Sequence, residues 1–126
     1  MEFLLEENSR GSTRHETMGL MSNISDGKST FVGVVEDISM NGLRISQVPA
    51  NFDDTVDKCY SIVKGPKNDF AIALQPRWVH ITNKGMYKMI GFEIEDPPAS
   101  WTDFVEGIKD NLAPFGFLMT ERAFAA

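Results

Sequence analysis

Cysteine, positive charge and long apolar runs are all scarce in this sequence of 126 residues. The single Cys59 excludes a disulfide within the chain, which fits a reducing compartment. With 18 acidic and 12 basic residues, the formal net charge is −6, so the chain lacks the basic field that long nucleic acid requires. The apolar run Phe3-Leu4-Leu5 is too short for a signal peptide or a membrane span. We therefore expect a cytoplasmic protein.

Side chains suited to catalysis are scarce as well. His15 and His80 are the two histidines, and the sequence contains no His-x-x-His, Cys-x-x-Cys or Gly-x-Ser-x-Gly. The acidic pair Asp53-Asp54 lies in a loop-like stretch, where we expect two solvated charges. No constellation for metal binding or acyl transfer can be assembled from these residues. We expect neither an enzyme nor a bound metal.

The chain does contain a series of short apolar segments with a period of two, separated by turn residues. Its composition, 42% hydrophobic and 24% charged, is that of one ordinary globular domain. Pro76 indicates a bulge or an edge position, because proline cannot donate to a strand ladder. The pattern predicts six strands, at residues 17–24, 30–36, 43–46, 56–63, 70–81 and 86–95. Six short strands with one buried face favour a small antiparallel barrel or sandwich, which limits exposed edges.

The period changes after Pro97-Pro98. Ser100 followed by Asp103 resembles a helix start in which the serine is the cap. We expect a helix over residues 98–113 whose apolar stripe lies across the open end of the barrel. The stripe consists of Trp101, Phe104, Val105, Ile108 and Leu112. Residues 114–126 form an apolar tail, which we expect to pack either on its own barrel or on a second copy.

Two polar clusters flank the first predicted strands. Arg10 and Arg14 are four residues apart in segment 1–16, which has no sustained period and is typical of a flexible arm. Asp37 and Ser39 lie in the turn between the second and third strands, where both can face one concavity. Gly42 can adopt backbone angles that a Cβ would forbid, or let a ligand approach the main chain. Each cluster alone has an ordinary alternative, namely solvated charges on a terminus and common turn chemistry.

Taken together and in this order, Arg-x-x-x-Arg before the first strand and Asp-x-Ser-x-x-Gly after the second resemble the PilZ domain family. The resemblance covers about residues 8–112, and Gly42-Leu43-Arg44-Ile45 and Gly91-Phe92 look like two of the family's later strands. It implies an all-β fold, a six-stranded antiparallel split barrel over residues 17–97 with a C-terminal helix. It also implies a bacterial receptor for cyclic di-GMP that needs no cofactor. Asn41, where a small residue is frequent, departs from the family pattern.

The resemblance implies a role for each matching residue. Arg10 and Arg14 would hold the phosphates and guanines of cyclic di-GMP, Asp37 and Ser39 would hydrogen-bond a guanine edge, and Gly42 would shape the turn. The residue chemistry agrees, because guanidinium groups present planar donor forks to phosphate and to the acceptor edge of guanine. A carboxylate accepts the guanine N–H protons. The arm would fold over the ligand, and its movement would signal to a protein partner of unknown identity.

The alternative function is a PilZ-like module that binds protein and no nucleotide. Arg77-Trp78 and the apolar tail favour a protein partner, whether or not a nucleotide also binds. We expect a monomer or a weak homodimer that inserts into no membrane and binds no long nucleic acid.

Overall fold

The computed structural model describes residues 15–17 and 20–110 of the chain. These residues form seven strands, one α-helix and a short 3-10 turn. In chain order they are β1 (His15–Glu16), β2 (Met21–Ser25), β3 (Thr30–Ile38), β4 (Gly42–Pro49), β5 (Cys59–Lys64), β6 (Asp69–Thr82), η1 (Asn83–Gly85), β7 (Tyr87–Glu95) and α2 (Ala99–Asp110).

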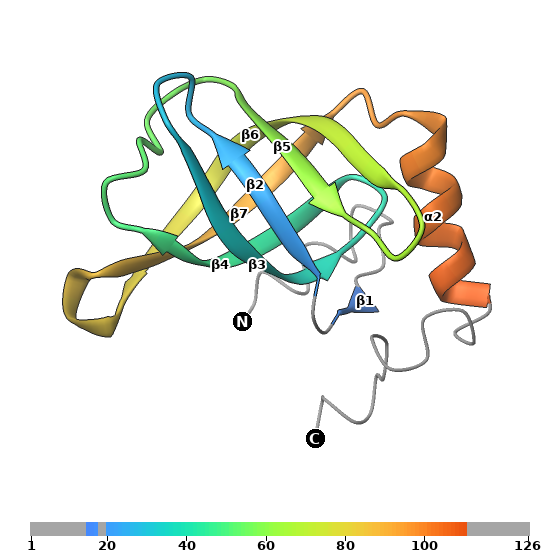
Figure 1. Ribbon diagram of the computed structural model, residues 1–126, viewed down its shortest axis with the longest axis horizontal. Helices are drawn as coiled ribbons and strands as arrows, with labels where there is room; N and C mark the ends of the chain where they lie inside the picture. Colours follow the sequence, from blue (N-terminus) through green and yellow to red (C-terminus); the bar gives the residue numbers. More distant parts are fainter. Residues whose placement is uncertain (1–14, 18–19, 111–126) are drawn as a thin grey trace.

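The strands β2 to β7 close into an antiparallel barrel (Figure 1). Their order around the barrel is β3-β2-β5-β6-β7-β4, and β4 pairs in turn with β3. The pairs β2–β3, β3–β4, β5–β6 and β6–β7 are antiparallel neighbours in the chain, whereas β2–β5 and β4–β7 are the longer-range pairings that close the barrel. The short β1 adds to β3 beside this closed set. The predicted all-β barrel with a C-terminal helix is therefore confirmed.

The core follows from the alternation of side chains along each strand. β5 alternates without exception, with Cys59, Ser61 and Val63 buried and the residues between them exposed. The buried hydroxyl of Ser61 is paired with that of Ser22, with 2.6 Å between the oxygens, so neither polar group is left unsatisfied in the interior. The core is filled mainly by aliphatic residues and closed by aromatic ones; its fully buried large members include Trp101, Phe52, Ile24, Ile38, Leu43, Ile45, Leu74, Ile90 and Ile108.

Helix α2 lies beside one end of the barrel, as the apolar stripe predicts (Figure 1). Trp101, Val105 and Ile108 are buried against the core, while Leu112 and residues 114–126 lie outside the described residues. The predicted cap is wrong. The helix begins at Ala99, and the Pro98 carbonyl accepts the Trp101 amide at 2.9 Å, so Ser100 lies inside the first turn. In the described part of the chain, no helix is long and apolar enough to cross a membrane.

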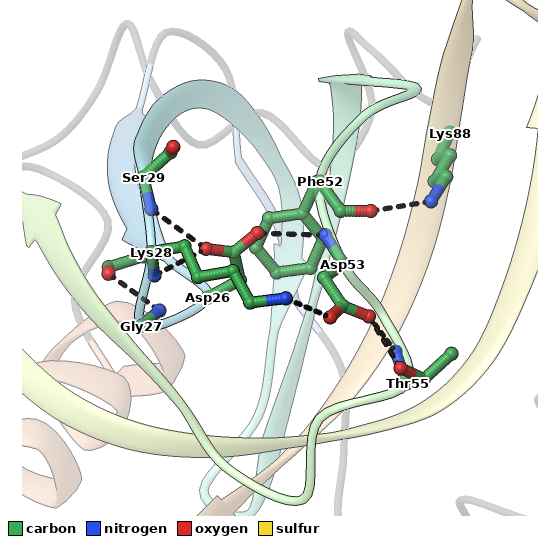
Figure 2. Close-up of polar contacts among 9 residues, drawn as sticks. Asp26, Gly27, Lys28, Ser29, Phe52, Asp53, Thr55 and Lys88 are labelled. Carbon is green, nitrogen blue, oxygen red and sulfur yellow. Dashed lines mark hydrogen bonds and ion pairs between the residues drawn. The ribbon is translucent and has the colours of Figure 1, made fainter.

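A polar network joins the β2–β3 hairpin to the loop between β4 and β5 (Figure 2). The Asp26 carboxylate accepts the backbone amides of Lys28, Ser29 and Asp53, each at 2.9 Å. These amides, that of Asp53 foremost, hold the pKa of Asp26 below its ordinary value. Thr55, through its hydroxyl and amide, and Lys28 lower the pKa of Asp53 to about 2.

The expectation that Asp53 and Asp54 are merely solvated is therefore wrong. Besides the contacts of Asp53, the Asp54 carboxylate accepts the Lys88 ammonium at 2.6 Å. Lys88 is only 9% exposed and also donates to the Phe52 carbonyl at 2.6 Å, so its charge is paired and hydrogen-bonded inside the loop. The acidic pair is a structural part of the loop that covers this side of the barrel.

Candidate functional site

The turn between β3 and β4 contains the predicted Asp-x-Ser-x-x-Gly motif. Ser39 is 2% exposed, and its backbone amide donates to the Gly42 carbonyl at 2.8 Å while its hydroxyl donates to the same carbonyl at 3.3 Å. Both contacts close the turn. Gly27 and Gly85 are the glycines with positive φ among the described residues, so Gly42 does not need the left-handed conformation. Gly42 instead begins β4, opposite Glu93 of β7.

A β-bulge in β3 sets the direction of Asp37. Val35 and Ile38 are both fully buried although they are three positions apart, which uninterrupted alternation would forbid. The register with β4 shifts between Val35 and Asp37, so Glu36 is the extra residue. The bulge therefore turns Asp37 to the outer wall of the barrel while keeping Ile38 in the core.

Asp37 is held there by an ion pair across the strands. The Arg44 guanidinium on β4 lies 2.7 Å from the Asp37 carboxylate, and the two residues face each other in the strand register. The Asp37 side chain is 5% exposed and that of Arg44 is 25% exposed, so water screens this pair less than a surface pair. Arg44 thus holds the predicted ligand-binding carboxylate in position.

The strand register extends this contact into a row across four strands. Asp37 on β3 faces Arg44 on β4, Arg44 faces Gly91 on β7, and Gly91 faces Trp78 on β6. A Cβ on Gly91 would lie 2.2 Å from the Trp78 indole, so the indole lies directly over the backbone of Gly91. These four residues, which we call the platform, offer an acidic group, a cation and an aromatic ring on one outer wall of the barrel.

The motif is also tied to the core and to the helix. The Trp101 indole N–H on α2 donates to the Ser39 carbonyl at 3.0 Å, and the Ile94 amide on β7 donates to the Asn41 carbonyl at 2.8 Å. The turn is therefore clamped from two sides. A rigid turn holds its binding groups in place at no further cost in conformational entropy when a ligand binds.

The structure brings some of the predicted site residues together. Asp37, Ser39 and Gly42 share one turn, whereas Arg10 and Arg14 lie outside the described residues. His15, which follows Arg14 in the chain, pairs with Ile38 at the end of β3, so the arm joins the barrel beside the motif. In the described chain, no three His, Cys, Asp or Glu side chains are grouped as metal ligands.

Three members of the platform, Arg44, Gly91 and Trp78, were not identified as site residues from the sequence. Arg44 follows the alternation of β4, which points it outward, and this alone could have marked it as a neighbour of the motif. Gly91 lies between two buried core residues of β7, and a glycine at an outward strand position often marks a close approach. The sequence could not predict that Trp78 covers Gly91, because this contact depends on the shift in the β6–β7 register between Pro76 and Trp78.

The close contact between Gly91 and Trp78 gives a testable prediction. Gly91→Ala is expected to lower the free energy of unfolding by about 1–3 kcal/mol, because the new methyl group overlaps the indole and forces it off the platform. Urea unfolding and iodide quenching of tryptophan fluorescence would measure both effects. Gly107→Ala on α2 is the matched control; a Cβ there meets no atom within 4 Å, so we expect a gain of about 0.5–1 kcal/mol. Equal stability of the Gly91→Ala and Gly107→Ala variants would contradict the contact.

Comparison with known proteins gives matches of structure. The sequence matches no family model and no curated protein. The fold is similar to that of the Bacillus subtilis inhibitor of motility MotI/DgrA, with a TM-score of 0.55 at 13% identity over 75% of this chain and 46% of that one. It is also similar to the Borreliella burgdorferi PlzA protein in complex with c-di-GMP, with a TM-score of 0.52 at 16% identity over 83% of this chain and 47% of that one. This chain thus spans about half the length of each, and the match confirms the PilZ-like fold.

Proposed function

We propose that this PilZ-like barrel is a receptor for cyclic di-GMP, which binds on the platform under the N-terminal arm. The observation that carries the proposal is the pairing of His15 with Ile38. Arg14 directly precedes His15, and Arg10 is five residues away from it. Five residues span at most about 18 Å, so both guanidinium groups remain within reach of Asp37. A cationic arm and an acidic turn at one place are what a guanine nucleotide with two phosphates requires.

Each residue contributes a distinct contact in this proposal. Asp37, fixed by Arg44, accepts the ring N–H and amino protons of a guanine. Arg10 and Arg14 donate to phosphate oxygens and to the acceptor edge of guanine, where charge-assisted and bidentate bonds are strong. The Trp78 indole, which lies in the space that Gly91 leaves open, stacks on a base with its other face. Ser39 and Gly42 hold the turn in shape.

The proposed signal is the movement of the arm. Binding orders the arm across the platform, which costs conformational entropy and is repaid by several charge-assisted contacts made together. The outer wall of the barrel then presents a different surface to a protein partner. The PlzA protein in complex with c-di-GMP shares this fold, which supports the choice of ligand.

Calorimetric titration of the intact chain with cyclic di-GMP tests the proposal. We expect measurable heat from the intact protein and a loss of affinity of roughly 10- to 150-fold in Asp37→Asn, since the amide replaces an acceptor by a donor and removes a charged hydrogen bond. Asp57→Asn, an exposed carboxylate between β4 and β5, is the matched control and should bind as the intact chain does.

Two other outcomes would decide against the receptor. No heat from the intact chain, measured at high protein concentration, would favour the module that binds only protein. Turnover of the nucleotide, followed by chromatography of the mixture, would reveal an enzyme.

A further inference from the structure

The bulge in β3 coincides with a break in the pairing on the other side of that strand. Towards β4, Glu36 is the extra residue. Towards the N-terminal strands, Asp37 pairs with Glu16 of β1 and Val34 pairs with Met21 of β2, so three steps along β3 face five steps of the other chain segment. The regular ladder is thus interrupted on both sides at one place. Backbone groups in such a gap need other hydrogen-bond partners.

Thr17, which directly follows β1, supplies two of these partners. It is only 8% exposed. Its backbone amide donates to the Glu36 carbonyl at 3.1 Å, and its hydroxyl donates to the Val35 carbonyl at 2.6 Å. In an uninterrupted strand, successive carbonyls point to opposite edges, so one neighbouring residue does not bond to both through its backbone. Thr17 therefore bridges the two peptide groups at which β3 departs from regular strand geometry.

The bulge is held by other contacts as well, but these reach different groups. The Val35 amide donates to the Leu20 carbonyl at 3.0 Å, and the Ser46 hydroxyl of β4 donates to the Glu36 carboxylate. Neither contact involves the carbonyls that Thr17 bonds. A bulge re-aims the side chains that follow it, and the residue that follows Glu36 is Asp37. The direction of the Asp37 side chain therefore depends on how the Val35 and Glu36 carbonyls are held.

We propose that Thr17 is a positioning residue for Asp37. By holding the two carbonyls of the bulge, it keeps the Asp37 carboxylate on the outer wall of the barrel, opposite Arg44. The inference rests on the proposed function for its effect on nucleotide affinity, and on the hydrogen bonds alone for the direction of Asp37. Thr17 is three residues from Arg14 in the sequence, so one short segment carries an arginine of the site and orients its carboxylate.

Thr17→Val tests this role by calorimetric titration of the full chain with cyclic di-GMP. Valine keeps the branched shape and removes the hydroxyl, so the Val35 carbonyl loses this donor. We expect the affinity to fall roughly tenfold, the change that one hydrogen bond of ordinary strength corresponds to. Thr17→Ser keeps the hydroxyl and should bind within about twofold of the intact chain.

Ser61→Ala is the control for a general loss of stability. It removes a buried hydrogen bond of the same length, 2.6 Å, that joins Ser61 on β5 to Ser22 on β2. We expect it to lower the midpoint of urea unfolding about as much as Thr17→Val does, because each variant loses one buried hydroxyl contact. It should leave the affinity for cyclic di-GMP unchanged, since it does not touch the bulge.

A second measurement needs no nucleotide. The NMR signal of the Asp37 carboxyl carbon, assigned by its loss in Asp37→Asn, reports on the surroundings of this side chain. We expect the signal to shift in Thr17→Val, to return to its original position in Thr17→Ser and to stay unchanged in Ser61→Ala. Circular dichroism confirms that each variant folds.

Every outcome decides the inference. Full affinity in Thr17→Val, or an equal loss of affinity in Thr17→Ser or Ser61→Ala, would overturn the positioning role. A loss of affinity without a shift of the Asp37 signal would overturn it too, because Thr17 would then act by another route. If the intact chain gives no heat, the receptor fails and the signal alone decides: a shift in Thr17→Val upholds the role of Thr17 in directing Asp37, and an unmoved signal overturns it.

Discussion

Replacing Arg14 by alanine is expected to weaken cyclic di-GMP binding by roughly 10- to 150-fold, and Arg10→Ala to have an effect of the same order. A charge-assisted hydrogen bond contributes about 1.5–3 kcal/mol net, and each proposed guanidinium makes at least one. The double variant should show no heat of binding. Isothermal calorimetry at low and high salt measures the loss of affinity. The affinity of the variants should depend less on salt, because fewer of their charges contact phosphate.

Two substitutions serve as controls for this prediction. Arg14→Lys keeps the charge and loses the planar fork, so an affinity between those of the intact chain and Arg14→Ala is expected if the contact is bidentate. Lys67→Ala removes an exposed cation in the turn between β5 and β6, and should leave binding unchanged. Full affinity in Arg10→Ala and Arg14→Ala would refute the proposed role of the arm.

The second large effect is expected at Trp101. Trp101→Ala should lower the free energy of unfolding by about 3–5 kcal/mol, the usual cost of deleting a large buried aromatic side chain. Trp101 is fully buried, meets the Phe70 ring edge-on at a centroid distance of 5.7 Å, and donates its indole N–H to the Ser39 carbonyl. The substitution leaves a cavity between helix and barrel and an unsatisfied carbonyl beneath the motif. Urea unfolding followed by circular dichroism measures the change.

Trp101→Phe separates the two contributions. It keeps most of the ring and removes the N–H, so a smaller loss of about 1–3 kcal/mol is expected from the orphaned Ser39 carbonyl. If the hydrogen bond steadies the motif, this variant should also bind cyclic di-GMP less tightly. A loss below about 1 kcal/mol in Trp101→Ala would mean that α2 contributes little to the fold.

The local pattern of the sequence predicted most strands and the helix. The alternation of apolar and polar residues marked β6 and β7. An Asp-Gly pair is typical of a hairpin turn, and Asp26-Gly27 does lie in the turn between β2 and β3, where Gly27 has φ +96°. Pro76 was expected at a bulge, and the register between β6 and β7 does shift next to it. These features depend on neighbours in the chain, which is why the sequence reveals them.

Other features depend on distant residues and left no local signal. β1 has two residues, too few to show a period, and its pairing with β3 was not predicted. The predicted cap, Ser100, was wrong. The Pro98 carbonyl accepts the first backbone amides of the helix, although serine is the commoner residue at a helix start. For the site, the motif turn was predicted, but the Arg44 ion pair depends on the bulge in β3, and the contact of Trp78 with Gly91 depends on the register shift between β6 and β7.

The extra residue in β3 makes the site sensitive to the number of residues as well as to their identity. Loss of Glu36 would restore simple alternation and leave Asp37 opposite Arg44, whereas loss of Asp37 would bring the longer side chain of Glu36 to that position. A relative that lost Asp37 through one in-frame deletion would thus keep its arginines, its turn and its folded barrel, but would present a carboxylate one methylene longer at this position. Such a relative would be recognised by one residue fewer between the positions of Val35 and Ile38, even where every other position of the motif is retained.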